Sequence, residues 1–164
     1  MRHLITFDDS PEEPHWVAVN DGVMGGRSSG TPNLAAGTLI FSGMLSLENN
    51  GGFSSVRSVG RDFDFSDIST VVLRVRGDGR RYQLRLATDA RHRGIAVSYG
   101  AGFDTIAGQW IEVRVPLAQL HPTARGASLQ GPPLDASHIR ELALLIADKR
   151  AGKFSLDVDW IGVE

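Results

Sequence analysis

The sequence predicts an all-β fold in which two antiparallel sheets pack as a sandwich within a single domain, residues 1–164. Short segments with apolar residues at every second position recur along the chain, and Gly, Pro, Asn and Asp separate them. Such spacing of short strands is typical of sandwiches and jelly rolls, and the length suffices for one domain with a sizeable core. Because helical patterns do not alternate with the strands, an α/β enzyme fold is not expected.

The expected strands follow one another closely. In order along the chain they are residues 2–7, 15–19, 37–47, 53–58, 71–76, 81–88, 95–99, 110–115, 142–147 and 154–160. A helical turn is expected only at residues 134–141, where Asp135 or Ser137 would act as the N-cap. The prediction is therefore a fold with few or no helices.

The clearest alternation lies in residues 71–76 and 81–88, which we expect to form a hairpin closed at Gly77-Asp78-Gly79. Gly77 or Gly79 would then have a positive φ. Polar side chains would share the outward face of this hairpin: Arg74, Arg76, Gln83 and Arg85, extended by Arg57, Glu112 and Arg114. This face is either a recognition surface for an acidic partner segment or an anionic ligand, or a solvated surface with Arg–Glu pairs.

Two glycine-rich stretches join the strands. Residues 19–30 read VNDGVMGGRSSG, but no helix follows them and their spacing matches no phosphate-binding motif, so we predict turns at residues 20–22 and 25–26. A second turn is expected at Asn50-Gly51-Gly52, between strands that end at Leu47 and begin at Phe53. The candidate binding residues in these loops are Asn20, Asp21, Arg27 and Asn50.

Composition excludes several functions. The net charge of −2 gives no general attraction to nucleic acid or to an anionic membrane, and no apolar run approaches the ~20 residues of a membrane helix. The chain has no cysteine and its five histidines are scattered, so thiolate catalysis and a histidine metal site are not expected. No nucleophile and base appear together. We therefore expect a cytoplasmic protein that is not an enzyme and needs no cofactor.

Five blocks of sequence carry a resemblance to a known family. They are Trp16 with VNDGVMGGRSSG, LENNGGFSSVRS, LRVRGDGRRYQLRL, and the segments FDTIAGQWIEVRVPLAQLHPTARG and PPLDASHIRELALLIADKRAGKFSLDVDWI. In this order, from Leu4 to Ile161, the chain resembles the complex I intermediate-associated protein 30 family. The resemblance implies a galactose-binding-domain-like jelly roll. It also implies kinship with mitochondrial assembly factors that chaperone intermediates of NADH:ubiquinone oxidoreductase.

The resemblance also directs attention to a groove and to a metal site. In jelly-roll binding domains one sheet curves into a concave groove, which here would hold the arginines with Tyr99 beside them. Trp16 and Trp110 are expected in the core, with sugar stacking as the alternative, and Trp160 in the core or under the N-terminal strand. Sugar-binding relatives often carry a structural calcium, for which two aspartate pairs are weak candidates: Asp8 with Asp9, and Asp157 with Asp159. No metal is otherwise expected.

These observations lead to one hypothesis and one alternative. The hypothesis is a non-catalytic domain that recognises a protein partner, such as subunits or assembly intermediates of complex I, through the arginine groove and the glycine-rich loops. The alternative is a module that binds a saccharide or another small ligand on the same fold.

Overall fold

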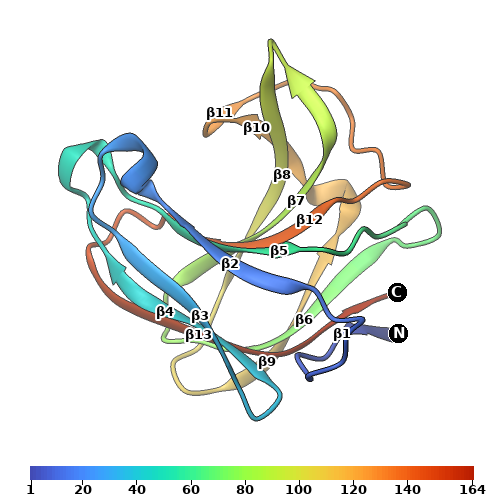
Figure 1. Cartoon of the computed structure of the whole chain (residues 1–164), viewed down its shortest axis with the longest axis horizontal. Helices are drawn as coiled ribbons and strands as arrows, with labels where there is room; N and C mark the ends of the chain where they lie inside the picture. Colours follow the sequence, from blue (N-terminus) through green and yellow to red (C-terminus); the bar gives the residue numbers. More distant parts are fainter.

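The computed structural model describes residues 1–22 and 25–164, and it confirms the predicted all-β jelly-roll sandwich of two antiparallel sheets (Figure 1). Sheet A has the order β3-β4-β13-β6-β9, with β1 also paired to β13. Its strands are β1 (Arg2–Ile5), β3 (Ser29–Ala35), β4 (Thr38–Leu45), β6 (Thr70–Arg76), β9 (Trp110–Pro116) and β13 (Gly152–Val163).

Sheet B has the order β11-β10-β8-β7-β12-β5-β2. Its strands are β2 (His15–Asn20), β5 (Ser54–Val59), β7 (Arg81–His92), β8 (Ile95–Asp104), β10 (His121–Ala124), β11 (Ala127–Ser128) and β12 (Glu141–Ile146). Three short 3₁₀ helices occur, at η1 (Asp21–Met24), η2 (Glu48–Asn50) and η3 (Leu117–Gln119). In the described residues no helix has the length and apolar character needed to cross a membrane.

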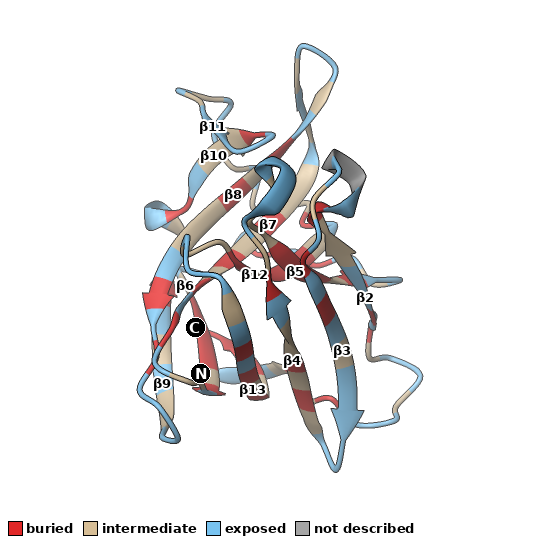
Figure 2. Cartoon of the chain, turned by 90° about the vertical axis from the view of Figure 1, so that its left-hand side faces the viewer, coloured by how far each residue is buried: buried red, intermediate tan, exposed pale blue. Residues whose placement is uncertain are grey.

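The core lies between the two sheets because every strand turns alternate side chains inward. Along β4, buried positions alternate with less buried ones, as Figure 2 shows. Leu73 and Val75 of β6 and Leu84 of β7 are fully buried in one cluster, as the sequence predicts. Trp16 is also in this cluster, packed against Phe7 at a ring-centroid distance of 5.7 Å, so its predicted core position is confirmed.

The predicted hairpin between residues 71–76 and 81–88 is wrong. β6 pairs with β13 and β9 in sheet A, whereas β7 pairs with β8 and β12 in sheet B. Residues 77–80 therefore cross from one sheet to the other. Gly79 has the expected positive φ of 89°, but Gly77 packs so closely on Thr105 that a Cβ there would lie 2.4 Å from the threonine Cβ.

Strand limits differ from the prediction where special contacts end or extend a strand. β1 ends at Ile5 because the Glu13 carboxylate accepts hydrogen bonds from the amides of Thr6 and Phe7, and Phe7 has a positive φ of 58°. β8 continues five residues beyond 99, through Gly100 and Gly102, which break the apolar alternation. Two further strand regions, β3 and β10–β11, were not among the expected strands.

Residues 134–141 form no helix. The Asp135 carboxylate instead accepts hydrogen bonds from the amide and the hydroxyl of Ser137, at 3.1 and 2.6 Å, and residues 136–137 form a turn. The isolated bridge between Phe63 and Ile139 holds this turn against the loop before β6. Such side-chain-to-backbone bonding competes with helix formation, which is why the capping residue is present without a helix.

Candidate functional site

The predicted arginine cluster is divided between two opposite faces of the sandwich. Arg74 and Arg76 lie on the outer face of sheet A, whereas Gln83 and Arg85 lie on the outer face of sheet B. The predicted inward and outward positions within each strand are correct, but the prediction that the two strands form one hairpin is wrong. The cause is the crossing at residues 77–80, which transfers the chain to the other sheet and reverses the direction in which its outward side chains point.

On sheet A the arginines are already neutralised by neighbours. Arg76 donates to Asp157 at 2.8 Å, and Arg74 forms an ion pair with Asp159 at 3.3 Å. Both guanidinium groups lie over the ring of Trp110, at 4.9 and 5.4 Å from its centroid. On this face the positive charges of Arg74 and Arg76 are therefore already paired with aspartates and with the Trp110 ring.

The expected core position of Trp110 is wrong. In β9 the residues Ile111 and Val113 pair with inward-facing residues of β6, so Trp110, opposite Arg76, faces outward. Trp160 stacks on His3 of β1 at a centroid distance of 4.3 Å, which agrees with packing under the N-terminal strand.

The candidate calcium ligands have other partners. Asp157 and Asp159 bind the sheet A arginines, Asp8 accepts hydrogen bonds from Thr6 and Ser10, and Asp9 is exposed. Within the described ranges, no group of three or more acidic or histidine side chains is placed to hold a metal ion.

On sheet B the central charged group is Arg85, half-buried in the floor of the concave face. Its Nε donates to the Ser98 hydroxyl at 2.8 Å, Nη1 to Gln83 at 2.7 Å, and Nη2 to Thr123 at 2.6 Å and to the Ser98 carbonyl. All four acceptors are neutral. Gly100 leaves the space for this side chain, since a Cβ at that position would lie 2.2 Å from Nη1.

Arg57 and Glu141 complete the charges of this floor. Arg57 lies across β12 from Arg85, and both residues pair with Ala143. The Arg57 Nε is 3.7 Å from a Glu141 carboxylate oxygen, and the two side chains are only 36% and 31% exposed. Burial raises the pKa of the Glu141 carboxyl, opposed by Arg57. Burial, and then the charge of Arg57, lower the pKa of the Arg85 guanidinium.

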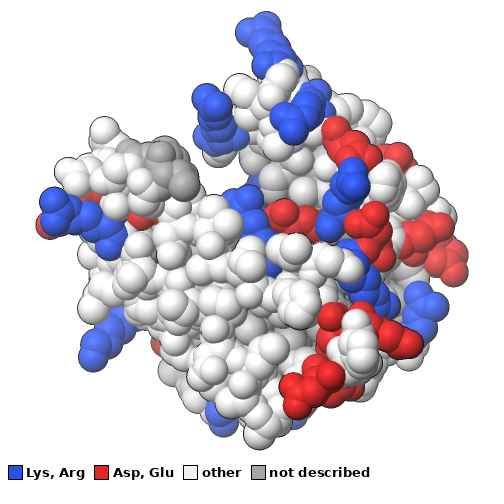
Figure 3. Space-filling view, in the orientation of Figure 1, with Lys and Arg blue, Asp and Glu red and all other residues white. Residues whose placement is uncertain are grey.

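We call this surface the sheet B groove: Gln83, Arg85, Ser98 and Thr123 from one half of the sheet, and Arg57, Glu141 and Ala143 from the other. In Figure 1, β7 and β8 rise at one end of sheet B and the loops that follow β2 and β4 stand at the other. Figure 3 shows the surface hollowed between these two parts, with cationic and acidic side chains in the hollow. The floor is polar and partly desolvated, which strengthens its electrostatic interactions.

The glycine-rich loops are held together by a buried carboxylate, which we call the Asp21 clamp. Asp21 is 0% exposed and accepts hydrogen bonds from the Ser28 hydroxyl (2.6 Å) and amide (2.9 Å) and from the amides of Gly52 (2.7 Å) and Phe53 (3.3 Å). Burial raises the pKa of this carboxyl, but the hydrogen bonds from Ser28, Gly52 and Phe53 together lower the pKa by a larger amount. The net shift of the pKa is therefore downward. The glycines of these two loops therefore allow the turns of the backbone around the Asp21 carboxylate.

The other loop candidates have structural or surface positions. Asn20 donates to the Gly30 carbonyl at 3.2 Å, and Asn50 has a positive φ of 60° in the turn that the sequence predicts. Arg27 is exposed and 3.6 Å from Glu48. The predicted turn at residues 20–22 is a short helix, η1, which ends at Gly25 with a φ of 87°.

The expectation that Tyr99 lies beside the groove is wrong. Tyr99 is 1% exposed and faces the core, where burial raises the pKa of its phenol and its hydroxyl donates to the Pro132 carbonyl at 2.9 Å. It lines a cavity of about 420 Å³ under residues 130–136. Tyr82 is also in the core, so neither tyrosine nor any tryptophan of the described chain forms the groove floor.

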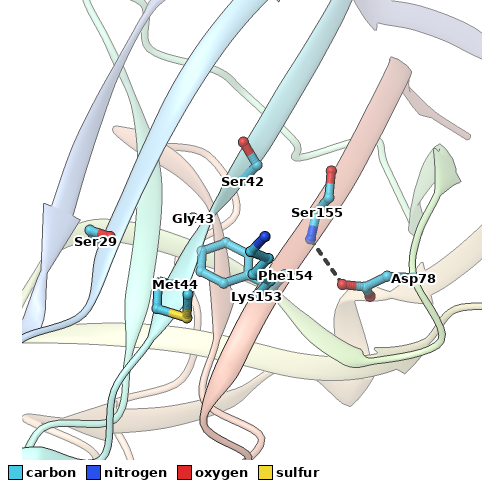
Figure 4. Close-up of a pocket in the computed structure, with 8 residues that line it drawn as sticks. All are labelled: Ser29, Ser42, Gly43, Met44, Asp78, Lys153, Phe154 and Ser155. Carbon is cyan, nitrogen blue, oxygen red and sulfur yellow. Dashed lines mark hydrogen bonds between the residues drawn. The ribbon is translucent and has the colours of Figure 1, made fainter.

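A second depression of about 570 Å³ lies beside β4 and β13 (Figure 4). Its charged lining residues are Asp78 and Lys153. Asp78 is occupied, because it accepts hydrogen bonds from the Ser155 amide at 2.9 Å, the Tyr82 hydroxyl and the Arg80 amide. This carboxylate fastens the crossing at residues 77–80 to β13, and we assign it no ligand.

Sequence reasoning missed four members of the groove: Ser98, Thr123, Glu141 and Ala143. The alternation of β12 could have indicated two of them, because Leu142, Leu144 and Ile146 face inward and residues 141 and 143 must face outward. The glycines at 100 and 102 were a further signal. Small residues on a strand often mark a close approach of another group.

The two antiparallel sheets and the concave face of sheet B define a jelly-roll domain. The chain is similar to a family 11 carbohydrate-binding module from Clostridium thermocellum, solved with a β-1,3-1,4-mixed-linked tetrasaccharide (TM-score 0.71, 15% identity, 99% of this chain and 94% of that chain). It is also similar to a family 30 carbohydrate-binding module (TM-score 0.63, 16% identity, 98% of each chain). At these identities the likeness concerns the fold alone.

The chain belongs to the complex I intermediate-associated protein 30 family, whose model matches residues 5–158. A curated relative is the mitochondrial complex I intermediate-associated protein 30 of Mus musculus, with 27% identity over 96% of this chain. The match covers 54% of that relative, so the chain spans about half its length. The family resemblance inferred from the sequence blocks is confirmed.

Proposed function

We propose that this chain is a non-catalytic domain that recognises a protein partner with the sheet B groove, in association with complex I assembly. Membership of the complex I intermediate-associated protein 30 family supports the type of role. The observation that carries the site is Arg85, a half-buried cation whose four hydrogen-bond acceptors are all neutral. A desolvated cation in a concave floor favours an acidic or strongly polar partner.

The alternative is a saccharide-binding module. Sugar rings bind largely by packing on aromatic faces, and none of the five Trp and Tyr side chains of the chain lies in the groove floor. The groove therefore favours a protein partner over a neutral glycan.

The experiment is capture of complex I subunits by the tagged chain in its native cell, with quantitative mass spectrometry. Ala87→Trp fills the groove between Glu141 and Ser98, whereas Ser155→Trp adds the same ring to the exposed outer face of sheet A. We expect the wild type and Ser155→Trp to enrich NADH:ubiquinone oxidoreductase subunits and Ala87→Trp to lose them, with unchanged circular dichroism.

Two results would contradict the proposal. One is that no such subunit is enriched by the wild type, and the other is that Ala87→Trp captures them as well as Ser155→Trp does. Binding of a mixed-linkage tetrasaccharide to the groove would support the alternative. The proposed compartment, the cytoplasm, is tested by fractionation of the same cells, since the mouse relative is named as mitochondrial.

A further inference from the structure

The charges of the sheet B groove do not balance. Its floor holds two guanidinium groups, from Arg57 and Arg85, and one carboxylate, from Glu141. Glu141 forms its ion pair with Arg57, and the contacts of Arg85 are to neutral groups. A partly desolvated cation is costly without an anion, so the groove is electrostatically suited to receive one negative group.

The two arginines are arranged around a small residue. Ala143 pairs directly with Arg57 on one side and with Arg85 on the other, and it is 5% exposed. Neighbouring strands lie about 4.8 Å apart, so the two arginine Cα atoms are roughly 10 Å apart across β12. Their long side chains can therefore approach one ligand group from opposite sides of β12, above the small side chain of Ala143.

Hydrogen-bond donors remain for such a ligand. Among the described contacts Arg57 uses only Nε, which donates to the Ser55 hydroxyl at 3.3 Å and pairs with Glu141. The two terminal nitrogens of Arg57 are therefore free to donate as a fork. Nη1 of Arg85 donates one of its two N–H groups to Gln83 and retains the other.

We propose that Arg57 and Arg85 form an anion subsite that takes a side-chain carboxylate from an extended acidic segment of a protein partner. This inference rests on the proposed function of the groove. The fork of Arg57 matches the planar geometry of a carboxylate. The neighbouring Glu141 carboxylate repels a second negative charge, which disfavours a phosphate dianion relative to a carboxylate. The polar floor without Trp or Tyr disfavours a neutral sugar.

The test is an NMR titration of the ¹⁵N-labelled chain at low salt with an acetylated, amidated hexaglutamate peptide. Hexaglutamine, inorganic phosphate and the mixed-linkage tetrasaccharide serve as comparison probes. We expect hexaglutamate to shift the Nε–Hε resonances of both arginines, and hexaglutamine to leave them unchanged. Arg57→Gln and Arg85→Gln should each weaken peptide binding at least tenfold, while Arg76→Gln removes the same charge on sheet A without effect.

Arg57→Gln keeps the proposal testable if Arg85→Gln does not fold, because Arg57 loses only one long ion pair and one hydrogen bond to the Ser55 hydroxyl. The proposal is overturned if hexaglutamate shifts neither arginine resonance, or if Arg57→Gln binds the peptide as the wild type does. It is also overturned if inorganic phosphate or the tetrasaccharide binds these arginines at a lower concentration than the peptide.

The same variants separate this inference from the proposed function. If capture of complex I subunits depends on Ala87 but not on Arg57, the anion subsite is wrong and the groove remains the partner surface. If hexaglutamate binds through both arginines but no complex I subunit is captured, the subsite stands and the proposed assembly role is wrong.

Discussion

Replacing Asp21 by alanine should destabilise the domain strongly, because four hydrogen bonds end on one fully buried carboxylate. An unpaired buried donor costs about 1–3 kcal/mol, and water entering the space left by alanine will satisfy part of the loss. We expect a total loss of about 3–5 kcal/mol in the free energy of unfolding, within the range of other broken buried polar networks. In a domain of this size that corresponds to a decrease of roughly 6–20 °C in Tm.

The assay is thermal and urea unfolding followed by circular dichroism, with Asp64→Ala as the matched control. Asp64 makes a similar pair of bonds to Ser66 but is exposed, so its loss should move Tm much less. A loss at Asp21 no larger than at Asp64 would refute the reasoning, since the buried carboxylate would then not hold the two loops together.

The clamp also predicts a dependence on pH. The pKa of Asp21 is lowered in the folded state, so the stability that its charge contributes is present above the unfolded pKa and is lost as the pH falls through the folded pKa. Asp21→Asn does not titrate. The difference in unfolding free energy between wild type and Asp21→Asn should therefore narrow below about pH 4. A difference that stays constant from pH 7 to pH 3 would contradict an ionised clamp.

Three further predictions follow from other contacts. Gly51→Ala should lower Tm, because the added Cβ would lie 2.6 Å from the carboxylate of the Asp21 clamp. Gly22→Ala is the control, since a Cβ there would enter open space, and equal Tm values for the two variants would contradict this packing. Arg80→Lys should lower the urea-measured stability by about 1–3 kcal/mol. Lysine keeps the charge but cannot reproduce the bidentate bond to Asp148, in which both side chains are 8% exposed. An unchanged stability would be inconsistent with this role of the guanidinium group. Arg76→Gln should alter the free energy of unfolding by no more than ~1 kcal/mol, because the ion pair with Asp157 is partly exposed. It should change the fluorescence emission of Trp110, since the guanidinium group lies over that ring, and an unchanged emission spectrum would contradict this contact.

The strands themselves could be predicted because alternation is local, whereas the sheet that each strand joins is not a local property. Val71 to Val75 and Tyr82 to Leu86 both show which side faces the core. The segment Gly77-Asp78-Gly79 has the composition of a hairpin turn, yet it crosses between sheets, where the Asp78 carboxylate accepts a hydrogen bond from the Ser155 amide, 77 residues away. No short window of sequence contains that contact.

The residues of the sheet B groove could be predicted only in part, again because the sheet that each strand joins is not a local property. The alternation correctly predicts that Arg57, Gln83 and Arg85 face away from the core, but the predicted hairpin wrongly puts Arg74 and Arg76 on the same face as them. Ser98 and Thr123, which hold Arg85 in place, come from strands that only the pairing of β8 with β7 and β10 brings together. Their role depends on register, which the sequence alone does not reveal.

The place of β13 has a consequence for biosynthesis. This strand is translated after every other strand of the two sheets, yet it lies in the interior of sheet A, between β4 and β6, and also pairs with β1. Until it leaves the ribosome, its neighbours have unpaired backbone groups along a full edge, where other chains can add. The nascent domain therefore stays vulnerable to aggregation until β13 has emerged and inserted between its two neighbours.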